Sequence, residues 1–245
     1  MTRSEDKSAH AAAPASPPTD SSAAELAVSS DQVLDEDYVL ALLGRPDASP
    51  GLIEQLSKSE AAGESRKVRR AIVSHPKTPR YVSLSLLRRL SNFDLMQVAL
   101  NPVIAGDLKI AAENLLIRLL ETISAGERIS LARRASGRIA AELLLDPERR
   151  VVSAAAENPR LTEALVVKAV LSAKGSKTLV ALLCKHPTWS LRQEIRIALL
   201  QDQDTPEHYC EDFAKSLPRG TSEAILRTGK LPEKVRTLLV SITKS

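Results

Sequence analysis

The sequence predicts an all-α protein in which about 12–14 short helices stack as repeated units. Three observations lead to this fold class. The chain is 43% hydrophobic, but Ala and Leu supply most of that content and aromatic residues make up only 2%. From about residue 31 onward, apolar residues recur with helical spacing. In addition, several of the expected helices end at an Asn or His that is followed directly by Pro.

The first 30 residues differ from the rest of the chain. Ala, Ser and Pro dominate residues 1–30, and no periodic apolar face is present. Such a segment buries too little apolar surface to offset its chain entropy, so we expect a disordered acidic tail there. Residues 31–245 are expected to form a single α-helical repeat domain. Glu5, Asp6 and Pro14 interrupt the pattern of a signal peptide, which favours a cytoplasmic protein.

The prolines that follow Asn or His are regularly spaced. Pro76, Pro102, Pro159 and Pro187 are separated by 26, 57 and 28 residues. Because 57 is close to two periods, we place a unit that has lost its signature at residues 132–137. Proline excludes the preceding residue from the α conformation and ends the helix there. The spacing therefore predicts units made of a helix, a tight corner and a second helix.

Each expected helix carries an apolar stripe with the i, i+3, i+4 and i+7 spacing. In chain order the stripes are Val82, Leu86 and Leu90; Leu108, Ala111, Ala112, Leu115, Leu116 and Leu119; Leu165, Val166, Ala169 and Val170; and Leu191, Ile195, Ala198 and Leu199. Helices of this length are only marginally stable alone in water, so they need neighbours, which stacked repeats supply.

The expected helix starts carry recognisable caps. Ser124 with Glu127, and Ser190 with Gln193, have the spacing of a capping box. Thr162 is expected to cap the helix that follows Asn158-Pro159. Three further starts pair an N-cap oxygen with Pro at the first helical position, namely Ser49-Pro50, Thr78-Pro79 and Thr205-Pro206.

One segment shows the complete repeat unit. Residues 143–165, LLLDPERRVVSAAAENPRLTEAL, combine an Asp-Pro corner, a helix that ends at Asn-Pro and a capped second helix. This pattern resembles the bacterial leucine-rich-repeat-variant family and is similar to HEAT-type repeats, over roughly residues 40–240. The resemblance implies a right-handed α-solenoid and no particular activity. The founding type of that family holds an iron–sulfur cluster on a Cys-rich N-terminal module; here the first cysteine is Cys184, so that cofactor does not carry over.

Catalytic and metal-binding patterns are weak in this sequence. His75 and His186 occupy the repeat position that Asn101 and Asn158 also hold, which predicts a corner hydrogen bond and not catalysis. His208 and Cys210 supply two ligands where a metal site needs three or four. The two cysteines exclude a disulfide framework. We therefore expect no catalytic residues, no metal and no other cofactor.

Charge is distributed unevenly along the chain. Residues 1–65 carry four basic and twelve acidic residues, whereas residues 66–150 carry sixteen and eight. Arginine doublets recur in the basic part, and stacked repeats would align equivalent helices. We expect an anionic-partner surface formed by Arg88, Arg89, Arg133, Arg134, Arg192 and Arg196. Solvated helix faces would have the same composition, and that alternative stays open.

These observations favour a non-enzymatic scaffold that mediates protein–protein interaction, with an acidic protein as the matching partner. Nucleic acid is the alternative partner, bound in a basic groove similar to that of HEAT-like DNA glycosylases. Against it, one Trp, two Phe and three Tyr offer few groups for base stacking. An accessory subunit is a second alternative. No run of ~18 apolar residues occurs, so no membrane span is expected. The sequence leaves the oligomeric state open.

Overall fold

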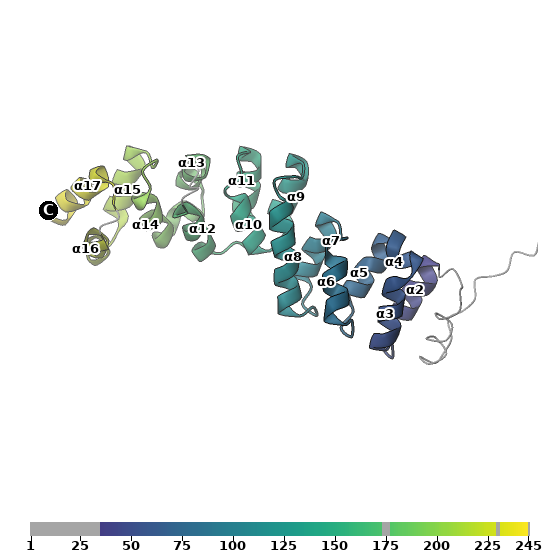
Figure 1. The fold of residues 1–245 in the computed structure, drawn as a ribbon. Helices are drawn as coiled ribbons and strands as arrows, with labels where there is room; N and C mark the ends of the chain where they lie inside the picture. The colour runs from purple at the N-terminus through teal and green to yellow at the C-terminus, as the bar shows by residue number, and fades with distance from the viewer. Residues whose placement is uncertain (1–34, 173–176, 229–230, 245) are drawn as a thin grey trace, which may run out of the picture. The chain divides into compact units, whose positions relative to one another are not determined.

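The computed structural model describes residues 35–172, 177–228 and 231–244, which form sixteen α-helices and one 3₁₀ helix (Figure 1). The all-α prediction is confirmed, and the helices pack mostly with near neighbours in the sequence, in a repeat-like arrangement. More helices form than expected, because single residues such as Ser59 end one helix and begin the next. The tail predicted at residues 1–30 lies outside the described residues.

Two compact units divide at Leu90 and Ser91, and the single-domain prediction for residues 31–245 stays a prediction. The helices of the first unit are α2 (Glu36–Leu43), α3 (Pro50–Lys58), α4 (Glu60–Glu64), α5 (Arg66–Ser74) and α6 (Arg80–Leu87). Helix α5 lies at the centre of this unit, since it contacts the other four helices. Its Val68 and Ile72 side chains are fully buried, as the apolar stripe requires.

The second unit begins at Ser91 and interleaves two rows of helices. Its elements are α7 (Asn92–Leu100), α8 (Gly106–Leu119), α9 (Ala125–Arg134), α10 (Gly137–Leu143), α11 (Arg149–Ala156), α12 (Glu163–Val170), α13 (Lys177–Lys185), η1 (Trp189–Leu191), α14 (Gln193–Gln201), α15 (Glu207–Ser216), α16 (Arg219–Thr228) and α17 (Glu233–Lys244). In one row α9 packs on α11 and α11 on α13; in the other α8, α10, α12 and α14 follow one another (Figure 1).

Serine begins six helices in the described part of the chain. Each hydroxyl accepts a hydrogen bond from the backbone N–H three residues later, which satisfies one of the free donors of the first turn. The serines are Ser49, Ser59, Ser65, Ser91, Ser124 and Ser136. The capping box predicted for Ser124 and Glu127 is confirmed, as is the Ser49-Pro50 start.

Of the other predicted helix starts, the one at Thr162 is confirmed, whereas those at Ser190, Thr78 and Thr205 were wrong. Arg192, and not Ser190, is the N-cap residue of α14, because residues 189–191 form a 3₁₀ turn ahead of it. Thr162 occupies the N-cap position of α12, but its hydroxyl makes no capping hydrogen bond. Thr78 and Thr205 lie one residue before their N-caps and instead donate to carbonyls six residues earlier, at 2.5 and 2.6 Å. These two threonines therefore close the preceding helix.

The corners share one hydrogen bond that explains why Asn, His and Asp replace one another. A side-chain oxygen or imidazole nitrogen accepts the backbone N–H two residues later and so closes the turn. This confirms the corner role predicted for His75 and His186. The acceptor and donor pairs are His75 with Lys77, Asn101 with Val103, Asp146 with Glu148, Asn158 with Arg160, His186 with Thr188, and Asp202 with Asp204.

Candidate functional site

The buried side chain of Asn158 joins two successive corners of the second unit. Its exposed fraction is 3%. The Nδ2 amide donates to the carbonyl oxygens of Ala132 at 2.6 Å and Ala135 at 3.1 Å. These carbonyls lie at the C-terminal end of α9, where helical partners are absent. The unit predicted to lack its own signature, at residues 132–137, thus receives its hydrogen-bond donors from the next corner.

The same corner holds Arg160 against the end of α9. The Arg160 backbone N–H donates to Asn158 Oδ1 at 2.8 Å, and its Nη1 donates to the Arg134 carbonyl oxygen at 3.3 Å. Gly137, the first residue of α10, allows the close approach: a Cβ atom there would overlap the Arg160 carbonyl oxygen. The backbone around Arg160 is therefore fixed from two sides.

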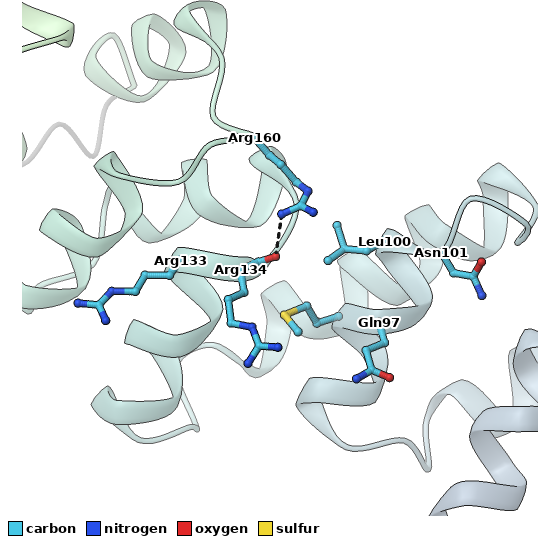
Figure 2. Close-up of a pocket in the computed structure, with 7 residues that line it drawn as sticks. Gln97, Leu100, Asn101, Arg133, Arg134 and Arg160 are labelled. Atoms are coloured by element: carbon cyan, nitrogen blue, oxygen red, sulfur yellow. Dashed lines mark hydrogen bonds between the residues drawn. The ribbon is translucent and has the colours of Figure 1, made fainter.

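A hollow of about 380 Å³ lies between α7 and the end of α9 (Figure 2). Its walls are formed by Met96, Gln97, Leu100, Asn101, Arg133, Arg134 and Arg160. Three of these residues are arginines and none is acidic. Within the described ranges, no carboxylate pairs with Arg133, Arg134 or Arg160. The hollow therefore presents positive charge that is not neutralised by neighbouring side chains.

The three arginines do not project in the same direction. In Figure 2 the Arg160 and Arg134 side chains lie on the side of the hollow that faces Leu100 and Gln97, whereas Arg133 extends away from them. Arg133 and Arg134 are exposed and stand in the last turn of α9, where the helix dipole favours cations. Arg134 and Arg160 are thus the pair best placed to meet one ligand.

The other four predicted arginines do not line this hollow. Arg88 and Arg89 belong to the first unit, where Arg89 donates to the Gly63 carbonyl oxygen at 3.1 Å. Arg192 is exposed at the start of α14. Arg196 is half-buried: its Nε donates to the Ser190 carbonyl oxygen at 2.6 Å and its Nη1 to Ser216 Oγ at 2.8 Å. The binding role of these four stays a prediction.

Sequence reasoning missed Arg160 and the α7 side of the hollow. Arg160 is a single arginine, so it did not belong to the doublets. A usable signal existed: Arg160 lies 26 residues after Arg134, the same distance that separates Pro76 from Pro102. Met96 and Leu100 carried no signal of their own, because their apolar character fits any helix core.

A second cavity, of about 460 Å³, shows the opposite electrostatic arrangement. Arg128 and Asp146 meet there at 2.7 Å, and both side chains are largely buried. Its walls are Ile117, Leu120, Glu121, Arg128, Glu142, Leu143, Leu145, Asp146 and Pro147. Because its arginine is paired with a buried carboxylate, we assign this cavity to the packing between α8, α9 and α10.

The two cysteines are buried free thiols. Burial, together with the nearby Cys210, raises the pKa of Cys184 to about 12, and burial also raises the pKa of Cys210. The reactive thiolate is therefore strongly disfavoured at neutral pH. Across residues 35–172, 177–228 and 231–244, no group of three or more His, Cys, Asp or Glu side chains is arranged to hold a metal ion.

Comparison with known proteins does not assign this chain to a family. No protein-family model, curated protein or solved structure matches the chain. Within the described part of the chain, every helix is too short or too polar to cross a membrane.

Proposed function

We propose that this protein is a non-enzymatic α-helical repeat scaffold that binds an acidic protein partner at the arginine-lined hollow. The observation that carries the proposal is the hollow itself, where Arg133, Arg134 and Arg160 gather without a carboxylate among the lining residues. Guanidinium groups form strong, charge-assisted hydrogen bonds with carboxylates. An acidic segment of another protein supplies the missing negative charge.

The proposal includes a right-handed α-solenoid built from HEAT-like or leucine-rich-repeat-variant units. Two features support it. The corner hydrogen bond recurs along the chain, and side chains reach back to the previous corner over 23 to 33 residues, as Asn158 does to Ala135 and Trp189 to Ala156. Helices two apart in sequence pack side by side in the second unit. Such stacks present extended surfaces that suit binding of partners.

We place the protein in the cytoplasm. Free thiols persist in reducing compartments, and Cys184 and Cys210 are both free. A partner encountered there would be bound at moderate ionic strength, where charges within ~8–10 Å still attract one another.

Nucleic acid is the second candidate partner, favoured by one further observation. Arg149 and Arg150 are exposed at the start of α11 and have no ion-pair partner among the described residues, so the second unit also carries basic residues outside the hollow. Phosphates would be attracted to such a surface. The hollow, however, has no aromatic residue in its walls on which a base could stack.

The proposal is tested by charge reversal in the full-length chain. Fluorescein-labelled polyglutamate serves as the acidic probe, and binding is followed by fluorescence anisotropy. We expect Arg134→Glu with Arg160→Glu to weaken binding by about tenfold or more. Arg149→Glu with Arg150→Glu makes the same change in net charge outside the hollow and should weaken binding of the probe by about threefold at most.

Equal losses in the two double variants would assign binding to net charge and contradict the proposal. Tighter binding of a single-stranded oligothymidylate than of polyglutamate would favour the nucleic-acid candidate. In that case the logarithm of affinity should fall linearly with the logarithm of salt concentration, with a slope of about −0.7 per phosphate neutralised.

A further inference from the structure

The hollow is amphipathic as well as positively charged. Met96 and Leu100 contribute apolar surface from the same helix, α7. Met96 is 3% exposed, whereas Leu100 is half-buried and so keeps part of its side chain accessible. Arg134, at the end of α9, and Arg160, in the corner between α11 and α12, lie on the other side (Figure 2). A ligand that fills the hollow therefore meets apolar and cationic walls at once.

The cationic wall is pre-organised on the Arg160 side. One guanidinium nitrogen of Arg160 is engaged by the Arg134 carbonyl oxygen at 3.3 Å, which orients the planar group and leaves its other N–H donors available. The backbone of Arg160 is fixed by Asn158 and by its contact with Gly137. Less side-chain entropy is lost when such a group binds, which favours a specific ligand over a diffuse ion cloud.

We infer that the hollow recognises a short linear peptide in which an apolar side chain is flanked by Asp or Glu residues. This inference rests on the proposed function and names the partner's chemistry. The carboxylates would pair with Arg134 and Arg160, and the apolar side chain would cover Leu100 and Met96. Leu100 supplies the accessible part of this apolar wall, so Leu, Ile, Val or Met would serve.

The size and lining of the hollow support a peptide over other anions. Its volume of about 380 Å³ is near the lower end of the ~300–1,000 Å³ typical of ligand sites, which suits a few side chains. A small inorganic anion would pair with the arginines but leave the apolar wall wet. A nucleotide base would find no aromatic ring among the lining residues.

The test compares fluorescein-labelled probes of matched length on the full chain by anisotropy. One dodecapeptide alternates Leu with Glu; the second has Ser in place of every Leu and the same charge; the third probe is an oligothymidylate of the same length. We expect the Leu/Glu peptide to bind the unmodified protein about tenfold or more tighter than the Ser/Glu peptide.

Substitutions in the hollow then locate that preference. Leu100→Ser should reduce the Leu-over-Ser ratio to about two or less while leaving Ser/Glu binding unchanged, because it removes only the apolar wall. Arg160→Glu should weaken both peptides. Arg150→Glu, outside the hollow, should leave the ratio unaltered. Circular dichroism of each variant checks folding, and the two-peptide comparison on the unmodified protein needs no variant.

The outcomes separate this inference from the proposed function. Equal affinity for the two peptides, combined with loss of both on Arg160→Glu, would overturn the peptide inference and leave the acidic-partner proposal standing. Failure of both peptides to bind, or binding indifferent to Arg134 and Arg160, would overturn both. Tighter binding of the oligothymidylate would overturn both in favour of nucleic acid.

Discussion

Asn101 and Asn158 precede prolines at corresponding corners, yet their surroundings differ. Both side chains close the local turn by accepting the N–H two residues later. Asn158 is buried where α11 packs on α9, and its amide donates to two carbonyls of the previous corner. Asn101 lines the arginine hollow instead. The same local motif therefore stands in a filled junction at one corner and beside an open hollow at the other.

The difference follows from the neighbours of each helix. Helix α9 meets α11 directly, so the corner that follows α11 seals the end of α9. Helix α7 packs mainly on α8, which at 14 residues is the longest helix in the described part of the chain. The side of α7 that carries Met96 and Leu100 is left beside the end of α9 with space between them. The hollow therefore lies where α7 and α9 pack less closely than α9 and α11 do.

The largest expected effect concerns Cys184, a buried thiol on α13. Its native pKa of about 12, against 9.0 for a free thiol, makes alkylation at pH 8 about a thousandfold slower than in the unfolded chain. Native and guanidinium-unfolded protein treated with iodoacetamide should show this contrast by mass spectrometry. Because the native thiol holds its proton, stability should fall as pH rises above about 9. Rapid native labelling would contradict the burial of Cys184 on α13.

Removing the joining amide should destabilise the filled corner far more than the open one. Asn158→Ala leaves the Ala132 and Ala135 carbonyls and the Arg160 N–H without their bonds, and we expect a loss of about 3 kcal/mol in the free energy of unfolding. Asn101→Ala loses one exposed bond and should cost about 0.5–1 kcal/mol. Urea unfolding measures both. Similar values for the two variants would remove the distinction between the corners.

Gly137→Ala and Gly126→Ala form a matched pair of substitutions that should change the free energy of unfolding in opposite directions. Gly137→Ala forces the Arg160 carbonyl away and should cost about 2 kcal/mol. It should also weaken binding of an acidic peptide, since it displaces Arg160. Gly126→Ala, in α9, meets nothing within 4 Å and should stabilise the protein by about 0.5–1 kcal/mol. If Gly137→Ala left the free energy of unfolding unchanged, Arg160 would not be held by this contact.

The smallest expected effects come from the helix caps. Ser124→Ala breaks a capping box and should cost about 1 kcal/mol. Thr162→Ala removes a hydroxyl that makes no capping bond and should cost less than about 0.5 kcal/mol. Thermal or urea unfolding of the two variants measures both losses in stability. A larger loss for Thr162→Ala would mean that α12 begins in a different way in solution.

Local chemistry made much of this fold predictable. Helix ends before Pro76 and Pro102 and starts at Ser49 and Ser124 depend on neighbouring residues, and the sequence indicates them directly. Thr78 was misassigned because only backbone geometry shows that its hydroxyl reaches back to Ile72. These errors shift helix starts by one or two residues and leave the fold class unchanged.

The arginine-lined hollow was only half predictable. Arg133 and Arg134 stood out as an arginine doublet, whereas Arg160 joins them through tertiary contacts with the Arg134 carbonyl oxygen and with Gly137. Leu100 resembles any core residue until the packing of α7 leaves it partly open. Whether residues far apart in the sequence meet depends on how the helices pack. The regular spacing of the prolines indicates that packing only approximately.

The most direct test of direct contact at the hollow is a charge-swap measurement by fluorescence anisotropy. Arg134→Glu with Arg160→Glu should lose the Leu/Glu peptide and gain a peptide in which Lys replaces every Glu, because the pairing is restored with the signs exchanged. Arg149→Glu with Arg150→Glu should not show this exchange. Recovery by the Lys peptide in the hollow variant alone is the predicted result; equal recovery in both variants, or none in either, would contradict a binding site at Arg134 and Arg160.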